Sequence, residues 1–241
     1  SSPDPRPQLP GNAGRELIPA QTALTGMRTK LRLLPLTLWL AVTQTMAGQI
    51  VLDEDDFEHV HFRRIQPTLI NFNQDTIHFD VNNSSSFLLL AFDAIKAVRT
   101  VSFEWKAHGK LNKGSIAQEK TREGDDAWLR IGLILSGEPE QVPELLLPHW
   151  VKQVRNTLEF PSDKMIYLIP DAWHAPGEIW SSPFSSNIDM ISVPSRPMNN
   201  DWQQAFYVFP EAQQIVGLWI MADGDNTDSM FSSQLRNLVI D

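Results

Sequence analysis

The sequence predicts a mainly β protein, a jelly-roll-like β-sandwich that carries one short helix. The first indication is strict alternation of apolar and polar residues, which puts Ile77, Phe79 and Val81 on one face of a strand. The second is the recurrence of turn-forming Asn, Ser, Gly and Pro between short apolar stretches. Because this pattern leaves the pairing of the strands open, an α+β fold with a large antiparallel sheet is the alternative.

Half-buried antiparallel strands are expected along most of the chain after residue 75. Val101, Phe103 and Trp105 repeat the alternation of residues 76–81, and short apolar runs mark the other strands. The predicted strands span residues 76–81, 87–92, 101–106, 128–135, 164–169, 188–193, 205–209, 215–221 and 235–240.

One segment has the spacing of a helix. Its apolar residues recur three or four positions apart, and Pro148 is tolerated in the first turn of a helix. These apolar residues are Leu147, Trp150, Val151, Val154 and Leu158. We expect the helix to pack on or beside the sheets.

Residues 27–47 have the order of a secretory signal peptide. A basic cluster follows Met27, then come ten uncharged residues, 33–42, and the segment closes on the small residue Ala47. The basic residues are Arg28, Lys30 and Arg32. The apolar run is too short to span a bilayer, so the pattern predicts export to the periplasm or the medium.

The predicted signal peptide divides the chain into three parts. Residues 1–26 are rich in proline without hydrophobic periodicity, and we interpret them as a spurious or disordered N-terminal extension. Residues 48–241 are expected to form a single β-sandwich domain without stable insertion in the membrane.

Charge and cysteine content exclude several classes of function. Without the five basic and two acidic residues of the first 47, 15 Lys and Arg face 27 Asp and Glu, a net charge of −12. Such a charge repels phosphate backbones, so nucleic acid is not an expected partner. The chain has no cysteine, which excludes disulfides, thiol catalysis and cysteine metal sites.

The loop at residues 223–228 is the first candidate site. Asp223, Asp225 and Asp228 offer the hard oxygen ligands that calcium prefers, and Asn226 adds an amide. The alternative is a turn in which Asp and Asn side chains bond their own backbone. The loop does not follow the spacing of an EF-hand.

Asp125 and Asp126 are the second candidate site. Adjacent carboxylates on a regular strand point to opposite faces, so one is expected to pair with Arg130 or Lys106. A joint ligand-binding site with the later Asp loop forms if the two strands are neighbours. Acid–base catalysis by these residues is the alternative, and whether the protein is an enzyme stays open.

Three tryptophans in proline-rich or loop-like sequence are candidate ligand contacts. Trp173, Trp180 and Trp202 offer large apolar rings near Asp, Asn and His side chains, a combination that holds sugar rings. The alternative is that these rings cover the cores of their loops, since tryptophan is usually well buried.

Two histidines, His59 and His61, alternate in a segment near Asp55 and Asp56. A spacing of two on a strand places both imidazoles on one side, as a metal site requires, but the sequence offers no clear third ligand.

Three segments together resemble a bacterial family of exported domains of unknown function. They are a Trp-rich strand at 103–106, an Asp-Asp pair within 123–131, and an Asp-x-Asp-Asn-Thr loop within 217–227. The resemblance covers about residues 100 to 241 and implies a β-sandwich by analogy with carbohydrate-binding folds. Residues 235–238 depart from the aromatic-glycine-aspartate closure of that family.

Three functions follow from these candidates. The leading hypothesis is a non-catalytic binder of glycan or another envelope component, with calcium as a candidate cofactor. The second is an envelope glycan hydrolase or lyase that uses Asp residues. The third is a structural protein that assembles with another protein through its aromatic loops.

Overall fold

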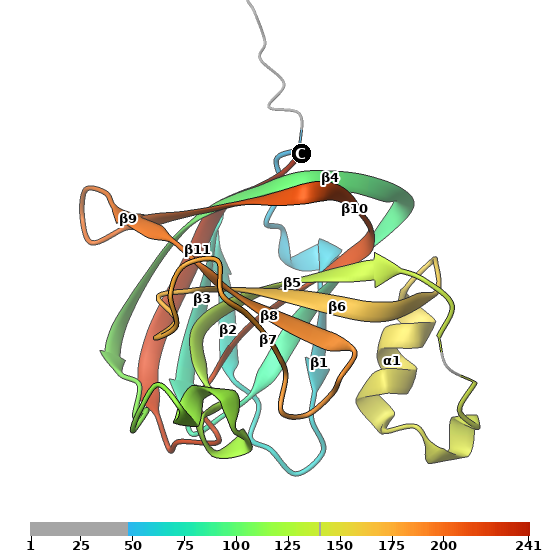
Figure 1. Cartoon of the computed structure of the whole chain (residues 1–241), viewed down its shortest axis with the longest axis horizontal. Coiled ribbons are helices and arrows are strands. Elements are labelled where there is room, and N and C mark those ends of the chain that lie inside the picture. Colours follow the sequence, from blue (N-terminus) through green and yellow to red (C-terminus); the bar gives the residue numbers. More distant parts are fainter. Residues whose placement is uncertain (1–47, 140) are drawn as a thin grey trace, which may run out of the picture. The chain divides into compact units, whose positions relative to one another are not determined.

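The computed structural model describes residues 48–139 and 141–241. The predicted extension, 1–26, and the predicted signal peptide, 27–47, lie outside these described residues. The described chain is mainly β with a single α-helix, which confirms the predicted fold class. Its strands form one mixed 11-stranded sheet that does not close into a barrel (Figure 1).

The elements have the following bounds. The strands are β1 (Glu58–His61), β2 (Leu69–Asn73), β3 (Thr76–Asn82), β4 (Ser86–Lys110), β5 (Ala127–Ser136), β6 (Ser162–Pro170), β7 (Ile179–Ser181), β8 (Ile188–Val193), β9 (Ser195–Pro197), β10 (Gln203–Asp223) and β11 (Met230–Ile240). The helix α1 spans His149–Thr157, and the 3-10 turns are η1 (Glu54–Asp56), η2 (Gln118–Lys120), η3 (Arg122–Gly124) and η4 (Glu144–Leu146).

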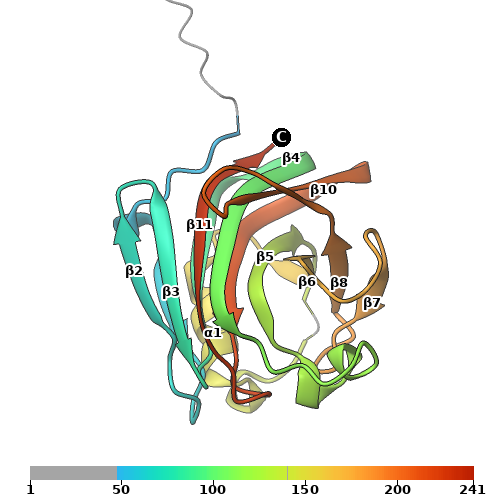
Figure 2. The ribbon, with the colours of Figure 1, turned by 90° about the vertical axis from the view of Figure 1, so that its left-hand side faces the viewer.

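Two long strands divide the sheet into two layers. The strand order is β2-β3-β11-β4-β10-β5-β6-β8-β7, with β1 added to β4 and β9 added to β10. The first half of β4 pairs with the second half of β10, and its second half pairs with β11 and the first half of β10. Residues 93–97 of β4, between these halves, are exposed. Both strands curve here, so the sheet curls around a core (Figures 1 and 2).

The pairing of β4 with β10 shifts register twice along this curve. The second shift lies between Ile215 and Gly217. A Cβ on Gly217 would lie 2.6 Å from the Leu90 carbonyl oxygen, so the close approach of the strands requires glycine here.

The main core lies between the two layers. Ile77, Phe79 and Val81 of β3 are buried in it, as the alternation predicts. Residues of β4, β5, β6, β10 and β11 complete the same cluster, including Val101, Phe103, Trp105, Leu129, Ile131, Leu133, Leu168, Leu218, Ile220 and Leu235. Contact between β11 and β5, which do not pair, shows that the layers face each other.

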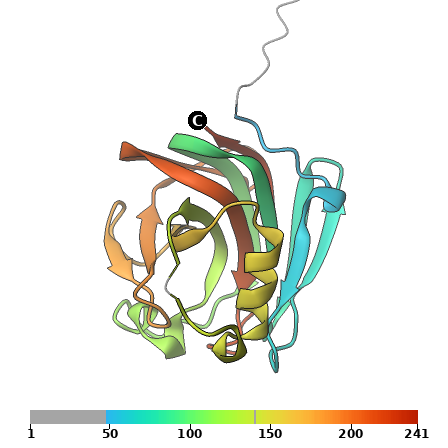
Figure 3. The ribbon, with the colours of Figure 1, turned by 90° about the vertical axis from the view of Figure 1, so that its right-hand side faces the viewer.

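A second apolar cluster covers the outer face of the layer that contains β5 and β10. The alternation that turns Leu218 and Ile220 inward turns Trp219 and Met221 outward into this cluster. The helix α1 lies against this face (Figure 3) and packs on the cluster through Trp150. The described residues contain no helix that is long and apolar enough to cross a membrane.

Candidate functional site

A cavity of about 320 Å³ opens on this outer face. It is lined by residues of β5, β6, β8, β10 and α1 and of the loops beside them. The lining residues are Phe62, Ile65, Ser85, Asp125, Arg130, Trp150, Tyr167, Ser182, Phe184, Ile188, Trp219, Met221, Asp223, Asp225 and Asn226. They form a charged group and an aromatic group, the combination typical of small-molecule sites.

Arg130 is the centre of the charged group. Its Nη1 donates to Asp223 Oδ2 at 2.8 Å, and its Nη2 donates to Asp125 Oδ1 at 3.1 Å and to the Asp125 carbonyl oxygen at 2.8 Å. All three side chains are buried. The antiparallel pairing of β5 with β10 brings them together, because it aligns Met221 with Arg130 and Asp223 with Ala127. One buried cation therefore holds two carboxylates.

Asp126 supports the loop that follows β10. Its Oδ1 accepts from the Asn226 N–H at 3.2 Å and from Asn226 Nδ2 at 3.1 Å. Its Oδ2 accepts from the Thr227 N–H at 2.7 Å and from Thr227 Oγ1 at 2.5 Å. Asp126 is buried, so these hydrogen bonds fix the loop at residues 225–227 against the start of β5.

Burial shifts the acidity of the cavity carboxyls. It raises the pKa of Asp125, and it raises the pKa of Asp223 well above its usual range, although Arg130 opposes both shifts. Burial and the nearby Asp126 charge also raise the pKa of Asp225. Asp225 is only partly buried and lines the cavity outside the Arg130 ion pairs, so it is the carboxyl best placed to meet a ligand.

The candidate calcium ligands are arranged differently from the predicted triad. Asp126, Asp223 and Asp225 each place one carboxylate oxygen within 4.8 Å of the others. Asp228 is exposed, and its carbonyl oxygen accepts a hydrogen bond from Asn112 Nδ2. Calcium takes about six to eight oxygen ligands, and here the Asp223 carboxylate already forms an ion pair with Arg130. The arrangement therefore favours a ligand that forms hydrogen bonds.

The aromatic group is built on two tryptophans. The Trp150 and Trp219 rings meet edge to face at 5.6 Å, and Phe62 meets Trp150 in the same way at 5.8 Å. The Arg130 guanidinium lies 5.6 Å from the Tyr167 ring centroid. Burial raises the pKa of Tyr167, so its hydroxyl stays protonated and can donate a hydrogen bond.

The three tryptophans singled out from the sequence do not line this cavity. Trp202 is 6% exposed and is contacted by Lys106 and Arg236. Trp180 of β7 is 7% exposed and belongs to the outer apolar cluster, but it does not line the cavity. Trp173 is 41% exposed, and its backbone N–H donates to the carboxylate of the buried Glu119 at 3.0 Å.

A different signal in the sequence could have located the cavity. Arg130 is the single charge in an apolar strand, and Trp219, Met221 and Asp223 recur on one face of the strand before the Asp loop.

Comparison with known proteins decides the family. A family model described as a protein of unknown function, DUF3047, matches residues 56–239. The chain belongs to the DUF3047 family. This confirms the resemblance to an uncharacterised family of domains of unknown function. The DUF3047 match includes every residue that lines the cavity. No curated protein matches the chain.

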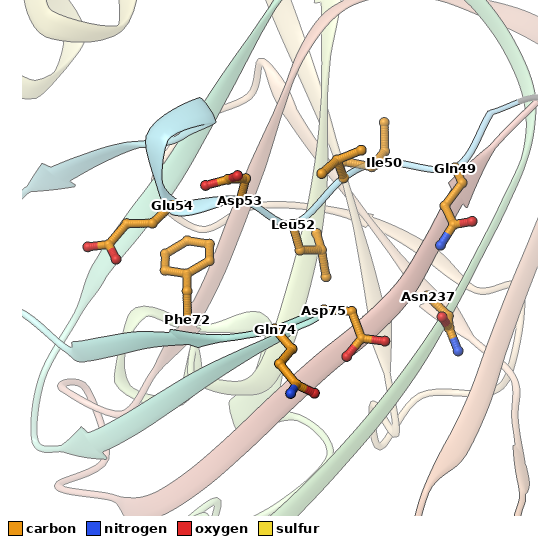
Figure 4. A pocket seen from close by; sticks show the side chains of 10 residues that line it. Gln49, Ile50, Leu52, Asp53, Glu54, Phe72, Gln74, Asp75 and Asn237 are labelled. Carbon is orange, nitrogen blue, oxygen red and sulfur yellow. The ribbon is translucent and has the colours of Figure 1, made fainter.

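The DUF3047 domain has a larger groove, of about 570 Å³, elsewhere on its surface. It is lined by residues 49–54, Phe72, the turn between β2 and β3, and Asn237 (Figure 4). Its polar side chains, including Asp53, Glu54 and Asp75, are all exposed, so no buried charged side chain lines this groove. The Arg130 cavity, which holds buried charges, is therefore the stronger candidate site.

Proposed function

We propose that this DUF3047 domain binds a neutral polyhydroxyl ligand, a sugar ring of a glycan or of another envelope component, in the Arg130 cavity. The observation that carries this proposal is the joint presence of Trp150 and Trp219 with the buried Asp125–Arg130–Asp223 group. Aromatic rings cover the apolar faces of a sugar, while carboxylates accept hydrogen bonds from its hydroxyls.

The charges of the cavity support a neutral ligand. Three lining carboxylates surround one guanidinium, so an anionic ligand would meet repulsion. The volume lies at the lower end of the range of about 300–1,000 Å³ that is usual for small-molecule sites, so it suits a single ring.

An envelope glycan hydrolase or lyase is the second candidate. The observation that favours it is the convergence of Asp125, Asp223 and Asp225 on one cavity, with raised pKa values. Glycosidases use a carboxylic acid of raised pKa beside an ionised carboxylate. Binding remains the leading proposal because Arg130 holds two of the three carboxylates in ion pairs.

Binding is tested by thermal unfolding of the protein with glucose, N-acetylglucosamine and short oligosaccharides built from them. A bound sugar at a hundredfold excess over Kd stabilises the fold by about 2.7 kcal/mol. We expect Asp225→Asn and Trp150→Ala to abolish this shift. Asp228→Asn, an exposed carboxylate in the same loop, is the matched control and should keep it.

The same thermal unfolding experiments, together with an assay for reducing ends, distinguish sugar binding from calcium binding and from hydrolysis. If no neutral sugar shifts the melting temperature, or if Asp225→Asn and Asp228→Asn behave alike, the binding proposal fails. Calcium chloride against excess chelator is expected to leave the melting temperature unchanged. A calcium shift that Asp225→Asn removes would make the carboxylates a cation site. Release of reducing ends from the oligosaccharides would establish the hydrolase.

We also propose that the chain is exported. The support is the order of residues 27–47 together with the start of the family match at residue 56, beyond that segment. Expression in a bacterium should yield periplasmic or secreted protein whose intact mass matches a chain that begins at Gly48. Protein that is recovered only from the cytoplasm with residues 27–47 attached would contradict export.

A further inference from the structure

Three histidines line a second groove, of about 440 Å³, beside α1. His59 and His61 come from β1, and His149 is the first residue of α1. Phe62 lines both this groove and the Arg130 cavity, but no residue of the Arg130 ion pairs lines it. The histidine groove is therefore a separate place with its own chemistry.

The strand β1 presents two imidazoles on one side. Val60, between the two histidines, is fully buried, so His59 and His61 both point away from the core and are exposed. Their ring centroids lie 4.3 Å apart. The two imidazoles are therefore neighbours in the groove.

Hydrogen bonds to Ser86 orient the His59 ring. The Ser86 hydroxyl accepts from the Thr68 N–H at 3.0 Å and donates to the Thr68 carbonyl oxygen at 3.5 Å. His59 Nε2 lies 2.8 Å from the same hydroxyl oxygen. The donor in this contact depends on the histidine tautomer, and in the tautomer whose Nε2 donates, the lone pair is on Nδ1. An outer hydrogen bond of this kind fixes the tautomer of a metal-binding histidine.

The helix α1 is fixed to β1 by a carboxylate. Glu58 accepts hydrogen bonds from Gln153 Nε2 at 2.5 Å and from Thr157 Oγ1. His149, Gln153 and Thr157 are spaced by four, so they share one side of the helix. His149 lies one turn before Gln153 and lines the groove with it, and α1 lies beside β1 (Figure 1).

We propose that His59, His61 and His149 bind one Zn²⁺ or Cu²⁺ ion, with water completing its coordination. Imidazole suits these ions, and three protein ligands with an open position form a known type of zinc site. No carboxylate lines the groove, which disfavours Mg²⁺ and Ca²⁺. The nitrogens of the three rings are not all within 4.8 Å of one another in the structure, so binding requires a change of rotamer at the exposed His61 and His149, and at the exposed Arg63, which also lines the groove.

The test is calorimetric titration of the full chain, without a polyhistidine tag, with Zn²⁺, Cu²⁺ and Mg²⁺. We expect one Zn²⁺ or Cu²⁺ per chain and no binding of Mg²⁺. His61→Ala and His149→Ala should each weaken binding at least about tenfold, because even the loss of an outer partner of a ligand costs that much. His108→Ala, an exposed histidine of β4, is the matched control.

Each outcome decides the proposal. Weakening in both groove variants with normal binding in His108→Ala supports the three-histidine site, as do three imidazole nitrogens in the Cu²⁺ electron paramagnetic resonance spectrum. Unchanged binding in His149→Ala overturns it, as does equal weakening in His108→Ala. Circular dichroism of each variant is the check on folding, and because the substituted side chains are exposed we expect unchanged spectra.

Discussion

Replacing Arg130 with methionine is expected to lower the free energy of unfolding by about 3–5 kcal/mol at neutral pH. The substitution keeps most of the buried volume but leaves Asp125 and Asp223 as carboxylates in the interior without their cation. Removing one partner of a buried ion pair costs this much because the remaining charge has lost both its water and its counter-charge. Urea unfolding followed by tryptophan fluorescence measures the change.

A partly exposed ion pair between β11 and β4 of the same sheet provides the control. Arg236 donates to Glu104 at 2.8 Å, but the Arg236 side chain is 33% exposed. Glu104 is 12% exposed, so this pair keeps more contact with solvent than the Arg130 pairs, and Arg236→Met should destabilise the fold less than Arg130→Met. Equal losses in the two variants would show that the Arg130 group is not the buried charge centre described above.

The loss in Arg130→Met should also depend on pH. Without the guanidinium, the folded-state pKa values of Asp125 and Asp223 lie further above the unfolded value of about 3.9. A carboxyl of this kind destabilises the fold when it is ionised, so the loss of unfolding free energy has its full size at pH values above the folded-state pKa. This loss becomes smaller as the pH falls through the folded-state pKa. A loss that grows on acidification would contradict the argument.

Most of the strands could be predicted from the sequence because alternation reports burial on one face. The buried residues of β3 and of the second half of β4 follow this rule. The alternation failed where the long strands curve. Residues 93–97 are exposed, so the pattern indicated separate strands at 87–92 and 101–106 where β4 is continuous. In β10, exposed residues 210–212 interrupt the alternation in the same way.

The candidate site could be predicted only in its acidic half. Asp125 and Asp223 meet because β5 and β10 are neighbours, a pairing that the sequence left open. Trp150 and Trp219 read as ordinary helix and core residues, since their approach depends on how α1 packs on the outer face. The position of a cavity in an apolar cluster depends on packing between residues that are distant in the sequence, so local periodicity does not predict it.

Replacing Asp126 with alanine is expected to lower the free energy of unfolding by about 2–4 kcal/mol and to abolish ligand binding. Asp126 accepts four hydrogen bonds, two of them from the backbone N–H groups of Asn226 and Thr227, and alanine replaces none of them. Hydrogen exchange at these two amides should accelerate, because the loop that carries Asp225 loses its attachment to β5.

Asp225→Ala is the informative partner of this variant, because it changes the same residue type in the loop that Asp126 holds. Asp225 is a partly buried carboxyl with a raised pKa, so its removal at pH 7.5 relieves repulsion and should not destabilise the fold. Asp225→Ala should therefore lose ligand binding without losing stability, whereas Asp126→Ala loses both. If Asp126→Ala keeps wild-type stability, the hydrogen bonds of Asp126 do not hold the loop, and Asp126 itself becomes a candidate ligand contact.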